Sequence, residues 1–177
     1  EGGSEPRFEH DRVFTDGRSA WDHTLEIAAT CRTSLIPQGR RIGFKVEKLR
    51  PRSAVFGMDA IVRGRFPPQW PARADTPNPV ILQYLDAKLD HSPSSVVRET
   101  DELKRGEVDL ISETISMEGV RRASQAGREA NFNLKLRHGI TRVAQITVGL
   151  AGEDIESGQR VDIAHDLTTS SVTGRCV

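Results

Sequence analysis

Residues 63–90 read RGRFPPQWPARADTPNPVILQYLDAKLD, and two features of this stretch decide the predicted fold. The first is a set of five prolines, which lack the N–H that a sheet ladder needs: Pro67, Pro68, Pro71, Pro77 and Pro79. We therefore predict a loop between a strand that ends at Phe66 and a strand that starts at Val80. Trp70 is predicted to anchor this loop to the core or to a neighbour. The second feature is the apolar run of residues 80–89, which is typical of a strand buried on both faces.

Alternation of apolar and polar residues recurs on both sides of this stretch. It predicts further strands in residues 23–31, 40–48, 54–62, 106–115, 131–139, 140–150 and 159–167. Two segments have a helical pattern instead: residues 94–105, with Ser94 or Ser95 as the cap, and residues 116–130, which Gly119 and Gly127 weaken.

About eight strands, one or two short helices and no alternation of strand with helix predict an all-β fold. We expect an antiparallel β-sandwich of the jelly-roll type. The length of 177 residues suits one domain. Residues 1–20 are polar and rich in glycine, so we predict an extended N-terminal arm there and a single sandwich domain over residues 21–177.

The composition limits the choice of compartment and partner. The formal net charge is zero, so attraction to nucleic acid must come from a local patch. No run of about eighteen apolar residues is present, and we expect no membrane span. Cys31, in a predicted strand, and Cys176, near the end of the sequence, fit no zinc or redox spacing, and both a free thiol and a disulfide stay open.

The stretch IVRG, the proline loop with its tryptophan, and the strand PVILQYLDAKLD together resemble a known family. They are similar to the central pattern of the thirty-kilodalton superfamily of plant-virus movement proteins. The β-domain of that superfamily is related to the single jelly-roll coat proteins of small RNA viruses. Gly64 and Asp86 match its glycine and aspartate. The resemblance implies a jelly roll, a role in encapsidation or movement of a viral genome, and a location in the virion or the host cytoplasm.

Residues 40–65 form a basic segment with eight cationic side chains against two acidic ones, which leaves the rest of the chain at −6. On the predicted hairpin, Arg41 and Lys45 share one outward face, opposite to the apolar Ile42, Phe44 and Val46. This face could contact RNA phosphates or acidic residues of another subunit. The proposed contact residues are Arg40, Arg41, Lys45, Lys48, Arg50, Arg52, Arg63 and Arg65, with Trp70 and Pro71 as a loop interface.

Four of the five histidines stand beside an aspartate: His10, His23, His91 and His165. Adjacent strand residues point to opposite faces, so no such pair is by itself a chelate or a catalytic dyad. A protonation switch near pH 6 is a hypothesis that these histidines allow. The sequence has no nucleophile elbow, phosphate-binding loop or dinucleotide motif. We therefore predict no enzyme activity, no metal site and no cofactor.

Together these patterns predict a viral coat protein that forms homo-oligomers and contacts single-stranded RNA through the basic hairpin. A movement protein that binds single-stranded nucleic acid is the alternative within the same lineage. An extracellular or periplasmic β-sandwich binding module, with Cys31 and Cys176 oxidised, is the alternative from another class.

Overall fold

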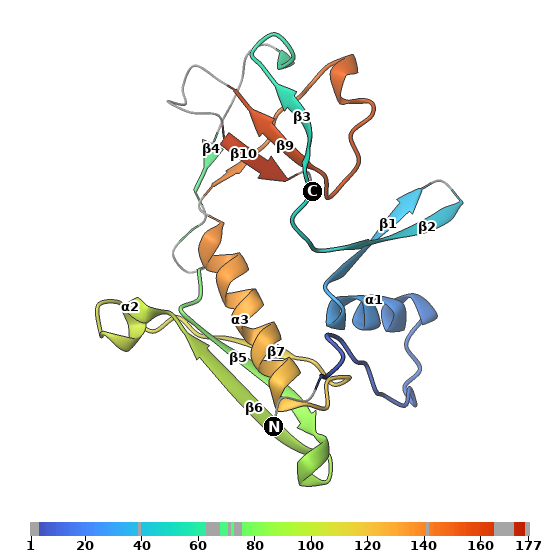
Figure 1. The fold of residues 1–177 in the computed structure, drawn as a ribbon, viewed down its shortest axis with the longest axis vertical. Helices are drawn as coiled ribbons and strands as arrows, with labels where there is room; N and C mark the ends of the chain where they lie inside the picture. Colours follow the sequence, from blue (N-terminus) through green and yellow to red (C-terminus); the bar gives the residue numbers. More distant parts are fainter. Residues whose placement is uncertain are drawn as a thin grey trace. The chain divides into compact units, whose positions relative to one another are not determined.

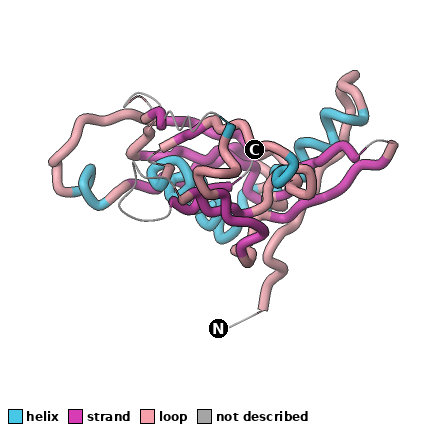
Figure 2. Tube along the Cα trace, turned by 90° about the horizontal axis from the view of Figure 1, so that it is seen from above, coloured by secondary structure: helices cyan, strands magenta, loops and turns pink. Residues whose placement is uncertain are grey.

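The computed structural model describes residues 4–38, 40–62, 68–70, 72, 76–140, 142–164 and 172–175. Strands outnumber helices among these residues, as predicted (Figures 1 and 2). The elements in chain order are α1 (Ala20–Thr30), β1 (Thr33–Gln38), β2 (Arg41–Val46), β3 (Arg52–Phe56), β4 (Pro68–Gln69), β5 (Pro79–Asp86), η3 (Ala87–Leu89), β6 (Ser92–Glu99), α2 (Asp101–Lys104), β7 (Glu113–Ser116), α3 (Ala123–Gly139), β8 (Val143–Ala144), η4 (Leu150–Gly152), β9 (Arg160–Ile163) and β10 (Val172–Arg175).

The chain divides into two compact units. Unit 1 comprises Glu1–Leu35 and Pro71–Thr141, and unit 2 comprises Ile36–Trp70 and Arg142–Val177. Most of unit 1 therefore lies, in sequence, between the two parts of unit 2. The single domain over residues 21–177 stays a prediction.

Unit 1 is built on a three-stranded sheet in the order β6-β5-β7, with α3 packed on one face (Figure 1). β5 and β6 are antiparallel through eight consecutive residue pairs, whereas β5 and β7 are parallel. Unit 2 contains a second mixed sheet in the order β10-β9-β3, in which β3 and β9 are parallel. A purely antiparallel jelly-roll sandwich is therefore not what these sheets form.

The central strand β5 confirms the strand predicted after the proline loop, with one change. Its burial alternates: Val80, Leu82 and Tyr84 face the core under α3, whereas Gln83 on the other face is exposed. The strand is thus covered on one face and not on both. It begins at Pro79 instead of Val80, which a first strand position tolerates. The short strand Pro68–Gln69 lies within the predicted proline loop, where no strand was expected, and pairs with β8.

Two predicted strands are helices. Residues 131–139 belong to α3, because Ala126, Ala130 and Leu134 recur at a spacing of four and bury one helical face on the sheet. Residues 23–31 belong to α1 and its C-cap. Ser19 and Asp22 form a capping box at the start of this helix, and that local signal outweighs the alternation of apolar residues.

One predicted helix is mostly a strand. Residues 92–99 pair with β5 as β6, and the helical part is confined to the single turn of α2. Its cap is Thr100, whose hydroxyl accepts a hydrogen bond from the Leu103 N–H at 3.3 Å, and not Ser94 or Ser95 as predicted. Favourable pairing along the whole of β5 outweighed the weak helical pattern.

Residues 4–19, which fall in the predicted arm, form neither helix nor strand and pack on α3. The side chain of Gln125, which is fully buried, pairs with both main-chain groups of Glu9 at 3.1 and 3.0 Å. Glu5 forms ion pairs with Arg122 and Arg128. The two hydrogen bonds from Gln125 satisfy main-chain groups of the segment and hold it along the first turns of α3.

Candidate interaction surfaces

The basic segment lies on β2 and the residues that flank it. Arg41 is exposed, as the predicted outward face requires, but Lys45 is covered and the apolar side chains of the other face are exposed. Ile42, Phe44 and Val46 are 52%, 66% and 42% exposed. Only 14% of the Lys45 side chain is exposed, and its Nζ donates to the Ser157 carbonyl at 2.7 Å. Ile42, Phe44 and Val46 thus share one face as predicted, but that face is exposed, whereas Lys45 on the other face is covered.

The physical reason is that the Lys45 side chain finds partners while the apolar side chains do not. Glu156 lies 3.6 Å from the Lys45 ammonium, and the aliphatic stem of the lysine packs over Gly158, where a Cβ would be 3.1 Å from its Cδ. A lysine can bury its stem in this way while its charge stays satisfied. The apolar stripe of Ile42, Phe44 and Val46 is left to solvent, or to another molecule.

The other predicted contact residues divide into three groups. Arg40, Arg41 and Lys48 are exposed and form no ion pair within the described residues. Arg52 is bound to the buried carboxylate of Asp162 at 2.8 Å, and Arg50 donates to the Val46 carbonyl at 3.5 Å, so both have intramolecular roles. Arg63, Gly64, Arg65 and Pro71 lie outside the described residues.

Trp70 is 68% exposed, so it does not anchor the loop to the core; the alternative, an anchor to a neighbour, stays a prediction. Asp86, the aspartate of the family resemblance, is buried and caps η3. Its carboxylate accepts hydrogen bonds from the Lys88 N–H at 2.8 Å and from the Tyr84 hydroxyl at 2.9 Å. Burial and this carboxylate raise the pKa of Tyr84. Asp86 is therefore a turn-forming residue in this fold.

The fold brings two of the histidines that stand beside an aspartate to one aromatic side chain. The ring of Phe14 lies 4.1 Å from that of His23 and 6.0 Å from that of His10. His10 Nδ1 is 3.1 Å from the Thr30 hydroxyl, and burial lowers the pKa of His10. His165 lies outside the described residues. Nothing in the sequence pattern showed that residues 10 and 23 would meet.

Cys31 is a free thiol at the C-cap of α1 rather than in a strand. Burial and the nearby Glu129 carboxylate raise its pKa. Cys176 lies outside the described residues. In the part of the chain that the structure describes, no three His, Cys, Asp or Glu side chains form a cluster suited to a metal ion. No helix among the described residues is long and apolar enough to cross a membrane.

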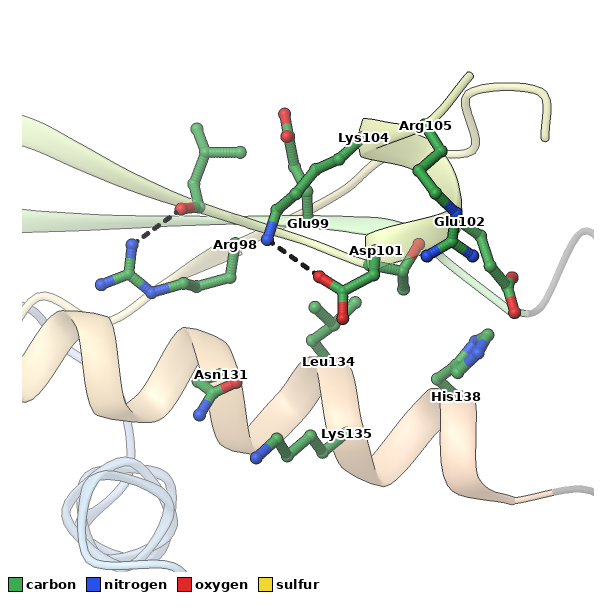
Figure 3. A pocket seen from close by; sticks show the side chains of 12 residues that line it. Arg98, Glu99, Asp101, Glu102, Lys104, Arg105, Asn131, Leu134, Lys135 and His138 are labelled. Atoms are coloured by element: carbon green, nitrogen blue, oxygen red, sulfur yellow. Dashed lines mark hydrogen bonds and ion pairs between the residues drawn. The ribbon is translucent and has the colours of Figure 1, made fainter. Parts of the chain in front are cut away.

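A groove of about 760 Å³ in unit 1 was not predicted from the sequence. It lies between the end of β6, α2 and the C-terminal half of α3 (Figure 3). Leu134, Asn131, Lys135 and His138 line it from α3, and both cationic and acidic side chains line it from β6 and α2. Its residues come from one segment predicted as a helix and one predicted as a strand, and no sequence pattern placed the two side by side.

No protein-family model and no curated protein sequence matches this chain. Solved structures do share its fold. One is described as "Virion of native gene transfer agent (GTA) particle", with a TM-score of 0.69, 13% identity, and coverage of 85% of this chain and 34% of that chain. A tail protein from Neisseria meningitidis MC58 gives a TM-score of 0.65, 14% identity, and coverage of 92% and 50%.

Prophage tail protein gp18 from Listeria monocytogenes EGD-e is similar at a TM-score of 0.51 and 12% identity, with coverage of 93% of this chain and 48% of that chain. The chain thus spans half or less of the length of these neighbours. At this identity the likeness concerns the fold. The shared fold is that of virion and tail proteins, and these neighbours give no support to the finer prediction of a jelly roll like that of RNA-virus coat or movement proteins.

Proposed function

We propose that this protein is a non-enzymatic structural component of a phage-tail-like or gene-transfer particle, and that it works by packing against other subunits. The likeness to virion and tail proteins supports the class of particle. The observation that carries a packing role is the apolar stripe of Ile42, Phe44 and Val46, exposed along one strand. Contiguous apolar side chains on a protein surface are a mark of interaction sites.

In this proposal the exposed cations Arg40, Arg41 and Lys48 form a polar rim around the stripe. Rim charges favour an acidic partner surface and orient it, while the apolar centre supplies most of the binding energy. Ile42 and Val46 are aliphatic and cannot stack on bases, which favours a protein partner over nucleic acid.

The test is incorporation of a tagged chain into particles in a strain that produces them. The variant Phe44→Ser removes the centre of the stripe, and we expect it to be depleted from purified particles at least about tenfold, the change that corresponds to about 1.4 kcal/mol. Leu150→Ser, at another highly exposed apolar side chain of unit 2, is the control and should be incorporated normally. Equal incorporation of the two variants, or absence of the wild-type chain from particles, would contradict the proposal.

Contact with the packaged genome is the second candidate, and it rests on Arg40, Arg41 and Lys48. If that genome is single-stranded RNA, this candidate is the coat-like or movement-like role predicted from the sequence. Phosphate contacts by three cations predict binding to DNA or RNA that weakens steeply with salt. A filter-binding series with both nucleic acids, in which the triple glutamine variant binds as well as the wild type, would exclude this candidate.

A further inference from the structure

The sheet of unit 1 has an edge that no described strand covers. β6 is the end strand of the order β6-β5-β7, and its eight residues pair with β5 without a break in register. Among the described residues, no strand pairs with its other side. A long and regular free edge offers N–H and C=O groups to a further extended segment.

The groove described above lies beside the end of this edge. The Val97 side chain of β6 is 44% exposed and faces away from α3, because its neighbour Val96 packs in the core under α3. Leu134 lines the groove on the α3 side, where it is 5% exposed (Figure 3). The Arg98 guanidinium lies against Gly127 of α3, so close that a Cβ at that glycine would overlap it. The same guanidinium donates a hydrogen bond to the Val97 carbonyl at 3.1 Å. A short apolar surface is thus available next to open backbone.

The charges on the two walls of the groove differ. On the α2 wall, Asp101 pairs with Lys104 at 3.2 Å, and Arg105 is held by both oxygens of Glu107. Glu102 on the same wall forms no ion pair within the described residues, so this wall is acidic. On the α3 wall, Lys135 and His138 form no ion pair within the described residues. An extended occupant that presents a carboxylate to the α3 wall, and an apolar side chain from the next residue to Val97 on the other face, would complement this edge.

The same unit exposes a segment with these properties, residues 107–112, which lead into β7. The Asn78 side chain donates to the Asp109 carbonyl and accepts from the Ile111 N–H at 2.8 Å, so those two residues turn their main-chain groups toward β5. In an extended chain the groups of Leu110 then turn away from β5. The Leu110 side chain is 69% exposed, and Asp109 forms no ion pair within the described residues.

We propose that the free edge of β6 and its groove bind residues 107–112 of a second copy of this chain. Leu110 of that copy packs on Val97 on the outer face of the sheet, and the adjacent Asp109 points to the α3 side, where it faces Lys135. Because the groove and the segment are different patches of one chain, every copy carries both halves of the contact, so the contact can repeat from copy to copy. This inference rests on the proposed function as a subunit of a particle and names one of its contacts.

The experiment is sedimentation velocity of the full chain over a concentration series. The wild type should self-associate, and Leu110→Asp should raise the dissociation constant at least about tenfold. The matched control is Leu150→Asp in unit 2, at a leucine that is 83% exposed, and this variant should associate like the wild type. Circular dichroism of each variant establishes that the fold is retained.

Charge reversal identifies the partner residue. Asp109→Lys and Lys135→Glu should each weaken association, and the double variant should recover it, because the pair is restored between copies. A wild-type chain that stays monomeric at the highest concentration, equal effects of Leu110→Asp and Leu150→Asp, or a double variant no better than the single ones would each overturn the inference.

The outcome is separable from that of the proposed function. If the wild type enters particles and Leu110→Asp does so equally well, the particle role stands and this contact is wrong. If the charge-reversal cycle closes but the chain never enters particles, the contact stands and the particle role is wrong.

Discussion

The buried ion pair between Arg32 and Glu129 gives the sharpest prediction for stability. The Glu129 side chain is 1% exposed and that of Arg32 is 14% exposed. Nε and Nη2 of the arginine both lie 2.9 Å from carboxylate oxygens, and its guanidinium carbon is 4.0 Å from the centre of the Phe132 ring. The pair joins the end of α1 to α3 across 97 residues of sequence.

We expect Arg32→Ala to lower the free energy of unfolding of unit 1 by about 3–5 kcal/mol, because it leaves the Glu129 carboxylate buried without its partner. This loss is a large part of the roughly 5–15 kcal/mol that stabilises a typical domain. Arg32 has φ of +51°, but alanine also has a Cβ, so the substitution does not relieve the backbone and the comparison is clean.

The assay is urea unfolding followed by Trp21 fluorescence in a Trp70→Phe background, so that the signal comes from α1 of unit 1. The control is Arg105→Ala, which removes an equally bidentate pair with Glu107 in the same unit. Both of its partners are more than half exposed, so we expect no measurable loss. If the free energy of unfolding falls by the same amount in both variants, burial does not determine how much the Arg32–Glu129 pair contributes to stability, and the reasoning is refuted.

Two further predictions concern the extended segment of residues 4–19. Burial, with Arg12 and Arg121 nearby, holds the pKa of His10 below its usual 6.5, so its stabilising contribution is complete above pH 6.5 and is lost as the pH falls through the lower, folded-state pKa. Urea midpoints measured from pH 7.5 to 5 should therefore decline in the wild type and decline less in His10→Gln; parallel curves would contradict this. At Gly119 a Cβ would overlap the imidazole of His10, so Gly119→Ala should speed tryptic cleavage after Arg12 or Arg18 by about tenfold, the effect of a loss of about 1.4 kcal/mol. Gly17→Ala, with open space around it, should not, and equal cleavage of both variants would show that the imidazole does not fix the segment.

The sequence by itself determined the elements in which the local pattern and the long-range partner agree. β2, β5 and β9 lie where alternation or an apolar run predicted strands. It also located the basic segment. These properties follow from backbone sterics and from the spacing of apolar residues, which neighbouring residues alone fix.

Tertiary structure decided the rest. Alternation along the strand predicts that Lys45 and Phe44 lie on opposite faces. That Lys45 is covered and Phe44 is exposed depends on the contacts of Lys45 with Ser157 and Glu156, more than a hundred residues away. Residues 131–139 alternate as a strand would, yet burial of Leu134 in register with Ala130 made them helical. The parallel pairing of β5 with β7, and the groove beside β6, depend on which strands meet. No local pattern contains that information, because it is set by the free energy of packing the whole unit.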